Sequence, residues 1–158
     1  MKTHMLIALL LLTGSAQAQE DREKQYLEGA GMGYARPAER NHFPGPMHVL
    51  ELADQLKLTG EQRAATQKLM ETHKAQARGI GAELVAAERE LELLFRGGNV
   101  DEATLARAAR TTAALEGEYR LAHLETHRRM RGLLSEEQVK RYDELRGHSS
   151  AKQERHRH

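Results

Sequence analysis

Nine histidines are the most reactive side chains in this 158-residue sequence, which has no cysteine. His123 and His127 are four residues apart, so on a helix both imidazoles lie on one face, a spacing that suits capture of one divalent metal ion. Three imidazoles with a nearby carboxylate or thioether favour Zn, Ni, Co or Cu. Solvated histidines on a charged helix are the alternative interpretation, because the HxxxH pattern is only moderately specific.

The remaining ligands depend on which helix faces His123. If the chain reverses near Gly98, His73 comes level with His123. Glu71 and Met70 then fall within one helical turn of the three histidines. The sequence therefore predicts His123, His127 and His73 as ligands of a possible metal site, with Glu71 or Met70 as the fourth.

Other histidines give weaker signals for a metal site. His48 could join it if the preceding Gly/Pro-rich segment folds back, and an ordinary residue in the first turn of a helix is the alternative. His148, His156 and His158 could scavenge metal, but they belong to a polar, basic tail over 148–158 that has the composition of a disordered segment.

Long helices are expected to position these side chains. No proline follows Pro46, and the sequence after it is rich in Ala, Leu, Glu, Arg and Lys, which predicts helices over about 47–56, 60–96, 101–133 and 136–146. The two long helices carry apolar seams with heptad-like spacing, and only Gly97-Gly98-Asn99 and a few neighbours separate them. Such a short link predicts an antiparallel helical hairpin flanked by two short helices, in an all-α fold.

The two ends of the chain have a different character. Residues 1–18 combine Lys2, an apolar run and Ala16-Gln17-Ala18, which is the pattern of a secretory signal peptide, so we expect the mature chain to begin at Gln19. The apolar run is too short to span a membrane, and no later segment reaches that length. Residues 19–46 are expected to form an irregular arm before the helical domain over 47–147, because 29–46 contains all three prolines and several glycines; a short helix around 20–28 is an open alternative for the start of this arm.

The composition argues against several classes of function. The formal net charge is +1, and removal of the signal peptide takes away Lys2, so the mature chain has no basic excess for binding nucleic acid. The lack of cysteine rules out disulfides and thiolate chemistry. There is also no glycine loop leading from a strand to a helix and no Ser-His-Asp constellation, so we expect a protein that is not an enzyme.

Two similar boxes bracket the predicted hairpin, one before each of two helices. The first is Leu58-Thr59-Gly60-Glu61-Gln62 and the second is Leu134-Ser135-Glu136-Glu137-Gln138. In each box a hydroxyl residue is followed three positions later by Gln, which is the spacing of a helix-capping box. The sequence therefore predicts a structural role for Thr59, Gln62, Ser135 and Gln138.

The boxes resemble the pair of LTxxQ motifs that names the Spy/CpxP family of periplasmic proteins, which includes zinc-resistance-associated proteins and heavy-metal sensors. Ser135 stands where the second Thr is expected, and still suits a helix cap. Other parts of the sequence extend the resemblance over about 31–147; they are Gly31-Met32-Gly33-Tyr34-Ala35, Phe43-Pro44-Gly45-Pro46, His48-Val49-Leu50-Glu51-Leu52 and the run from Gln138 to Gly147.

The resemblance implies a periplasmic, curved helical protein that often dimerises through its long helices. It implies either an ATP-independent chaperone or envelope-stress accessory that binds unfolded proteins, or a metal-binding or metal-sensing protein that informs a resistance system. The chaperone or stress-accessory role implies no cofactor. The metal-binding or metal-sensing role implies a bound Zn, Ni, Co or Cu ion. We also expect a homodimer, because Leu69, Leu93, Leu121 and Leu124 need cover from the short helices or another subunit.

Overall fold

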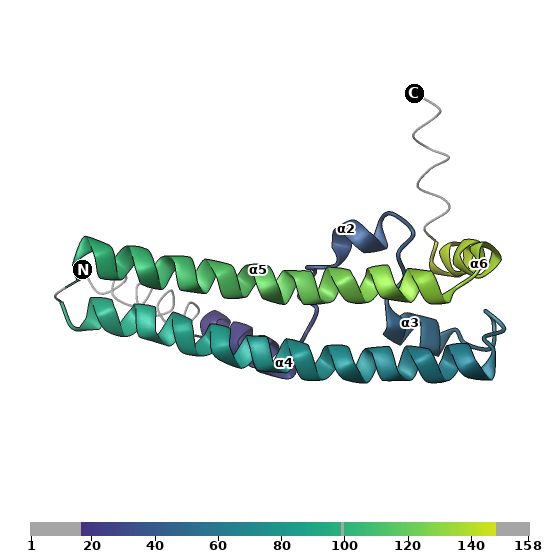
Figure 1. Ribbon diagram of the computed structural model, residues 1–158, viewed down its shortest axis with the longest axis horizontal. Helices are drawn as coiled ribbons and strands as arrows, with labels where there is room; N and C mark the ends of the chain where they lie inside the picture. The colour runs from purple at the N-terminus through teal and green to yellow at the C-terminus, as the bar shows by residue number, and fades with distance from the viewer. Residues whose placement is uncertain (1–16, 99, 148–158) are drawn as a thin grey trace, which may run out of the picture. The chain divides into compact units, whose positions relative to one another are not determined.

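The computed structural model describes residues 17–98 and 100–147, and all regular secondary structure in that part of the chain is helical (Figure 1). The helices are α2 (Arg36–Glu39), α3 (Pro46–Glu51), α4 (Gly60–Arg96), α5 (Glu102–Leu133) and α6 (Glu136–Arg146). Residues 17–28 are also helical. The prediction of an all-α chain whose two long helices pack together is confirmed. The expected signal peptide, apart from its last two residues, and the expected tail over 148–158 lie outside the described residues.

The limits of the long helices follow from local chemistry. The hydroxyl of Thr59 accepts a hydrogen bond from the Gln62 backbone N–H at 3.1 Å, which caps the start of α4. After α4, Gly98 has φ 72°, a left-handed conformation that glycine adopts without steric cost. The carboxylate of Asp101 then accepts from the Thr104 N–H at 2.9 Å, so Asp101 caps the start of α5.

The short helix α3 is shorter than the predicted range of 47–56. Regular α-helix ends at Glu51, and turns continue the chain to Lys57. Lys57 has φ 52°, the Leu58 N–H donates to the Ala53 carbonyl, and the Lys57 N–H donates to Asp54. This pair of bonds is the Schellman motif that ends helices. The helical path of the chain therefore ends at Leu56, although the turns before it are irregular.

The N-terminal arm is helical around 20–28, as the sequence allowed, and α2 adds a helix to the part that was expected to be irregular. Residues 17–28 are helical, and Gly29, with φ 71°, ends them with a second Schellman pair, in which the Ala30 N–H donates to Gln25 and the Gly29 N–H to Tyr26. Pro37 lies in the first turn of α2, where its missing N–H costs no hydrogen bond. The prolines therefore begin helices in this arm as well as interrupting it.

The described residues divide into two compact units, each containing part of α4 and part of α5. The first unit comprises residues up to 30 and Ala77–Glu116. Here Tyr26 is buried and lines one pocket with Val85 and Glu88 of α4, and Arg89 donates to the Glu23 carboxylate at 2.6 Å. Leu93 and Phe95 remain 57% and 61% exposed.

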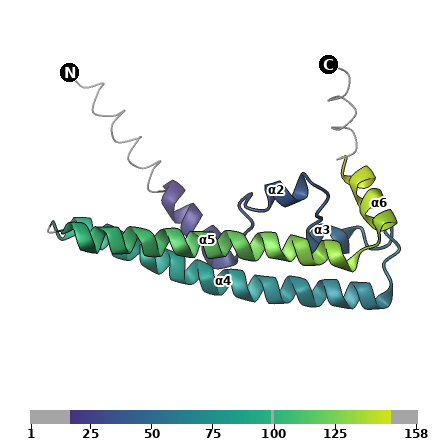
Figure 2. The same cartoon turned by 45° about the horizontal axis from the view of Figure 1, so that its top comes forward.

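The second unit comprises Gly31–Gln76 and the chain from Gly117 onward. In both views α2 and α3 lie against the C-terminal part of α5, and α6 follows directly from its end (Figure 1 and Figure 2). The unit has one apolar core, to which α3, α4, α5 and α6 all contribute; its buried members are Val49, Leu56, Leu69, Met130, Leu134, Val139 and Tyr142. Leu69, for which the sequence predicted a need for cover, is thus covered by its own chain.

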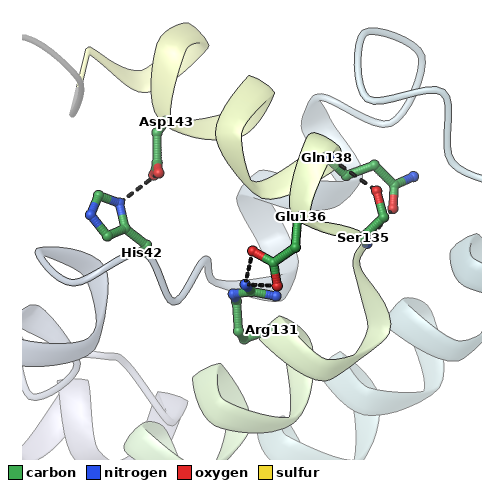
Figure 3. Close-up of polar contacts among 6 residues, drawn as sticks. All are labelled: His42, Arg131, Ser135, Glu136, Gln138 and Asp143. Atoms are coloured by element: carbon green, nitrogen blue, oxygen red, sulfur yellow. Dashed lines mark hydrogen bonds and ion pairs between the residues drawn. The ribbon is translucent and has the colours of Figure 1, made fainter.

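Polar contacts fix α6 within this second unit (Figure 3). Arg131, near the end of α5, donates to both carboxylate oxygens of Glu136 at 2.6 Å. The ring of His42, in the loop after α2, lies 2.6 Å from the buried carboxylate of Asp143. The arm, α5 and α6 are therefore joined by side chains as well as by the apolar core.

None of the described helices combines the length and the apolar character that a membrane span requires.

Candidate functional site

His73, His123 and His127 lie together in the second unit, as the register of the two long helices predicted. The rings of His73 and His123 meet edge to face, with centroids 4.5 Å apart. His123 is 4% exposed and His127 is 8% exposed. Both residues therefore belong to the buried face of α5 and are not solvated histidines on a charged helix.

The arm explains why this buried face is wider than the seam. The His127 Nδ1 lies 2.9 Å from the carbonyl oxygen of Phe43. Gly45 packs directly on the same ring, where a Cβ atom would be 3.0 Å from His127 Cε1. The arm therefore covers the flank of α5 that α4 leaves open. A heptad pattern describes only the contact between two helices, so it could not predict that the arm also packs on α5.

Backbone carbonyls also fix the hydrogen positions on two of the rings. The Nδ1 of His123 lies 2.9 Å from the Tyr119 carbonyl oxygen, as that of His127 does from Phe43. Because a carbonyl only accepts, both Nδ1 atoms carry the hydrogen, and both Nε2 atoms keep the lone pair that binds metals. Metal-binding histidines in proteins are commonly held in this way.

His73 differs in its electrostatics. Burial lowers its pKa from 6.5 to about 4, helped by the positive charges that His123 and His127 would carry, while a hydrogen bond to the Ala122 carbonyl acts in the opposite direction. The ring is therefore neutral at pH 7. Its Nδ1 is buried without a hydrogen-bond partner among the described residues, so an unused lone pair lies inside the cluster.

Aromatic rings complete the surroundings of the histidines, a feature that the sequence did not predict. The Tyr119 ring is fully buried and lies 4.7 Å from that of His123. Tyr34, from the arm, meets Tyr119 edge to face at 5.7 Å, and the Arg120 guanidinium lies 4.9 Å from the Tyr34 ring centroid. These contacts attach a second point of the arm to α5.

Two of the other predicted ligands, Glu71 and His48, do not join the cluster. Glu71 is exposed on α4, and Met70 is only partly buried. His48 pairs instead with Glu51, at 2.8 Å. The arm does fold back on the cluster, but the group that it contributes is the Phe43 carbonyl and not the His48 imidazole. Within residues 17–98 and 100–147, no group of three His, Asp or Glu side chains is arranged to hold a metal ion. The histidines of the tail lie outside the described residues.

The two boxes do the capping chemistry that their spacing predicted. In the first, the Gln62 side chain accepts from the Thr59 backbone N–H at 3.1 Å. In the second, the Ser135 hydroxyl accepts from the Gln138 N–H and the Gln138 side chain accepts from the Ser135 N–H, a complete capping box (Figure 3). The leucines Leu58 and Leu134 pack in or against the same apolar core. The hydrogen bonds therefore support the predicted capping role of Thr59, Gln62, Ser135 and Gln138.

The boxes also bind one another, which the sequence did not predict. The Gln62 amide donates to the Leu133 carbonyl at 2.9 Å, and that of Gln138 donates to the Leu56 carbonyl at 3.2 Å. Each glutamine thus satisfies a carbonyl next to the opposite box. The only hint in the sequence was that both boxes end in the same long amide residue.

Apolar side chains at the surface form a second candidate site. A groove of about 380 Å³ lies between α2, its following loop and α5, lined by Pro37, Ala38, Asn41, Phe43, Leu121, Leu124, Glu125 and Arg128. Leu121 is 55% exposed. Exposed apolar grooves of this kind are typical of sites that bind other polypeptides.

Comparison with known proteins identifies one family. The family described as LTXXQ motif family protein matches residues 45–146, which is more than half of the chain. No curated protein and no solved structure shows significant similarity. The matched range contains both boxes, all three clustered histidines and the helices α3 to α6.

Proposed function

The chain belongs to the LTXXQ motif family of Spy/CpxP type, whose members are typically periplasmic, and on that premise we propose that it is an ATP-independent periplasmic holdase for unfolded polypeptides. The role is one of binding rather than catalysis. It requires a surface that accepts apolar side chains of many sequences without a defined pocket. Envelope-stress signalling would use the same capacity for binding.

The observation that supports this proposal is the apolar groove beside Leu121. Leucine burial stabilises a complex by about 1.5–3 kcal/mol per side chain, so an apolar client segment gains by covering Leu121 and the Phe43 ring. The groove is open, which suits a segment without fixed structure. Covering this surface by a second copy of the chain would satisfy the same residues and is the homodimer alternative.

An aggregation assay tests the proposal. Reduced, unfolded lysozyme, a basic client, is diluted with increasing amounts of the protein in buffer that contains EDTA and no ATP, and turbidity is followed. We expect suppression at near-stoichiometric ratios, and a clear loss of suppression for Leu121→Gln. Leu145→Gln is the matched control, because Leu145 is also exposed, at 37%, but lies on α6 outside the groove. Equal suppression by both variants would remove the groove from the proposal, and no suppression by the parent would end it.

Divalent-metal binding is the second candidate function. The observation in its favour is the buried Nδ1 of His73 next to two rings whose Nε2 atoms keep their lone pairs. The cluster has nitrogen donors suited to Zn, Ni, Co or Cu, but no three ligating side chains converge among the described residues. The donor atoms of the three histidines are of the right chemical type for such an ion, but they do not converge on one point. Binding would therefore require the imidazole rings to turn.

A further inference from the structure

A second groove lies on a side of the second unit that the arm does not line. Its walls come from α4 and α5, and its lining includes Lys68, Leu69, Arg128, Arg129, Gly132 and Leu133. Its volume is about 520 Å³, within the range of roughly 300–1,000 Å³ typical of ligand sites. Leu69 is 5% exposed and forms part of the floor. The groove thus has an apolar floor and basic walls.

The charges of this groove have one sign. Lys68, Arg128 and Arg129 line it, and no acidic side chain does. Arg128 binds the Glu125 carboxylate at 2.6 and 2.7 Å, so its charge is partly compensated. Lys68 and Arg129 form no ion pair with a described residue. The chain as a whole has a net charge of only +1, so this is a local excess of positive charge.

We propose that this groove binds an acidic segment of an extended polypeptide, in which carboxylates alternate with apolar residues. The inference rests on the proposed holdase function, since it names a class of client segment. Charge complementarity requires carboxylates, and the apolar floor requires side chains that gain from burial. In an extended chain, residues two positions apart point to the same side. Carboxylates and apolar residues that alternate at every second position can therefore all enter the groove, the carboxylates against the basic walls and the apolar side chains on Leu69 and Leu133.

Gly132 gives the groove an open edge. It lies inside α5, and a Cβ built on it meets no heavy atom within 4 Å. Gly117 shares both properties but does not line the groove. Leucine is a far better helix former than glycine, so leucine at either position should raise the melting temperature. Only leucine at position 132 would fill the space that the client segment needs.

Fluorescence anisotropy tests the proposal with a labelled peptide of glutamates and leucines separated by serines, and a counterpart with glutamine in place of glutamate. We expect the acidic peptide to bind the full chain at least about tenfold more tightly, with a strong loss at high salt, because exposed charges are screened. Lys68→Glu with Arg129→Glu should weaken binding by about tenfold or more. Lys74→Glu with Lys140→Glu, the same charge change outside the groove, should leave it within about twofold.

The glycine pair provides the second test. Gly132→Leu should melt at a higher temperature yet lose the acidic peptide, whereas Gly117→Leu should gain stability and keep binding. Equal affinity for the two peptides, equal effects of the two charge reversals, or full binding by Gly132→Leu would each overturn the proposal. Displacement of the peptide by inorganic phosphate at equal charge would also overturn it, by showing a simple anion site. Lysozyme aggregation is scored separately, so a protein that protects lysozyme but ignores the acidic peptide refutes this inference alone.

Discussion

The side-chain amides of Gln62 and Gln138 exchange two hydrogen bonds, at 2.8 and 2.9 Å, although the residues are 76 positions apart. Each amide oxygen also accepts from a backbone N–H of its own box, and each nitrogen also donates to a carbonyl near the other box. All donors of both amides are thereby used. The motif glutamines therefore join the start of α4 to the start of α6, in addition to capping each helix.

The first prediction concerns this pair. Gln138→Ala should lower the free energy of unfolding by about 2–4 kcal/mol, because it removes one of the two acceptors of the Gln62 amide N–H groups and leaves the Leu56 carbonyl without its donor in a partly buried site. Ser135→Ala, which removes only the cap, should cost about 1 kcal/mol. Urea unfolding of both variants measures the difference.

A double-mutant cycle checks that the two glutamines act together. The double variant Gln62→Ala with Gln138→Ala should be more stable than the sum of the single effects predicts, with a coupling of about 1–2 kcal/mol, since the second substitution removes a group that already lacks its partner. Additive effects would mean that the two capping boxes are independent.

The boxes show how far the sequence predicts this structure and where it stops. Local rules predicted the caps at Thr59 and Ser135 correctly, because a cap depends on residues within one helical turn. The level pairing of His73 with His123 followed from the position of the glycine turn. The contacts of Phe43, Gly45 and Tyr34 with α5 could not be predicted, because they depend on how an arm of turns and short helices folds back over a long distance.

The second prediction concerns Gly45. A Cβ at this position would lie 3.0 Å from Cε1 and 3.2 Å from Nε2 of His127, a ring held by the Phe43 carbonyl. Gly45→Ala should therefore destabilise the fold by about 1–3 kcal/mol, the usual cost of overpacking. Gly117→Ala should instead stabilise it by up to about 1 kcal/mol, since nothing lies within 4 Å and alanine favours helix. Thermal unfolding followed by circular dichroism distinguishes the two signs, and a stabilised Gly45→Ala would show that the arm is not packed on His127.

The third prediction concerns pH. The pKa of His73 falls from 6.5 in the unfolded chain to about 4 in the folded one, so between these values the unfolded chain binds a proton that the folded chain does not. The contribution of His73 to stability is therefore complete above pH 6.5 and is lost as the pH falls to about 4. The loss should be on the order of 2 kcal/mol, after allowance for the partial solvent access of the ring.

Urea unfolding across this pH range, with EDTA present, measures the slope. His73→Gln, which cannot titrate, should flatten the profile relative to the parent. His48→Gln is the control, because His48 pairs with Glu51 at the surface of α3 and is not in the cluster. A parent and a His73→Gln variant with parallel profiles would show that His73 titrates normally in the folded chain.

The last prediction concerns metal binding, the second candidate function. Ligation needs neutral imidazoles, and the carbonyls of Tyr119 and Phe43 leave the Nε2 atoms of His123 and His127 as the donors. If the cluster binds a divalent ion, isothermal titration with Zn, Ni, Co and Cu should give a dissociation constant below about 100 µM, which corresponds to about −5.5 kcal/mol. The melting temperature should then rise with metal concentration, by mass action.

The variants for this test must respect burial. Alanine at positions 123 and 127 would leave cavities, since both rings are buried, so His123→Gln with His127→Gln is the better choice. We expect this variant to lose tight binding and the metal-dependent rise in melting temperature, while His48→Gln keeps both. If the double variant binds as tightly as the parent, the ligands lie elsewhere in the chain. If the parent binds no metal below about 100 µM, the cluster is a packed core element, and the orphaned nitrogen of His73 is a cost of that packing rather than a ligand.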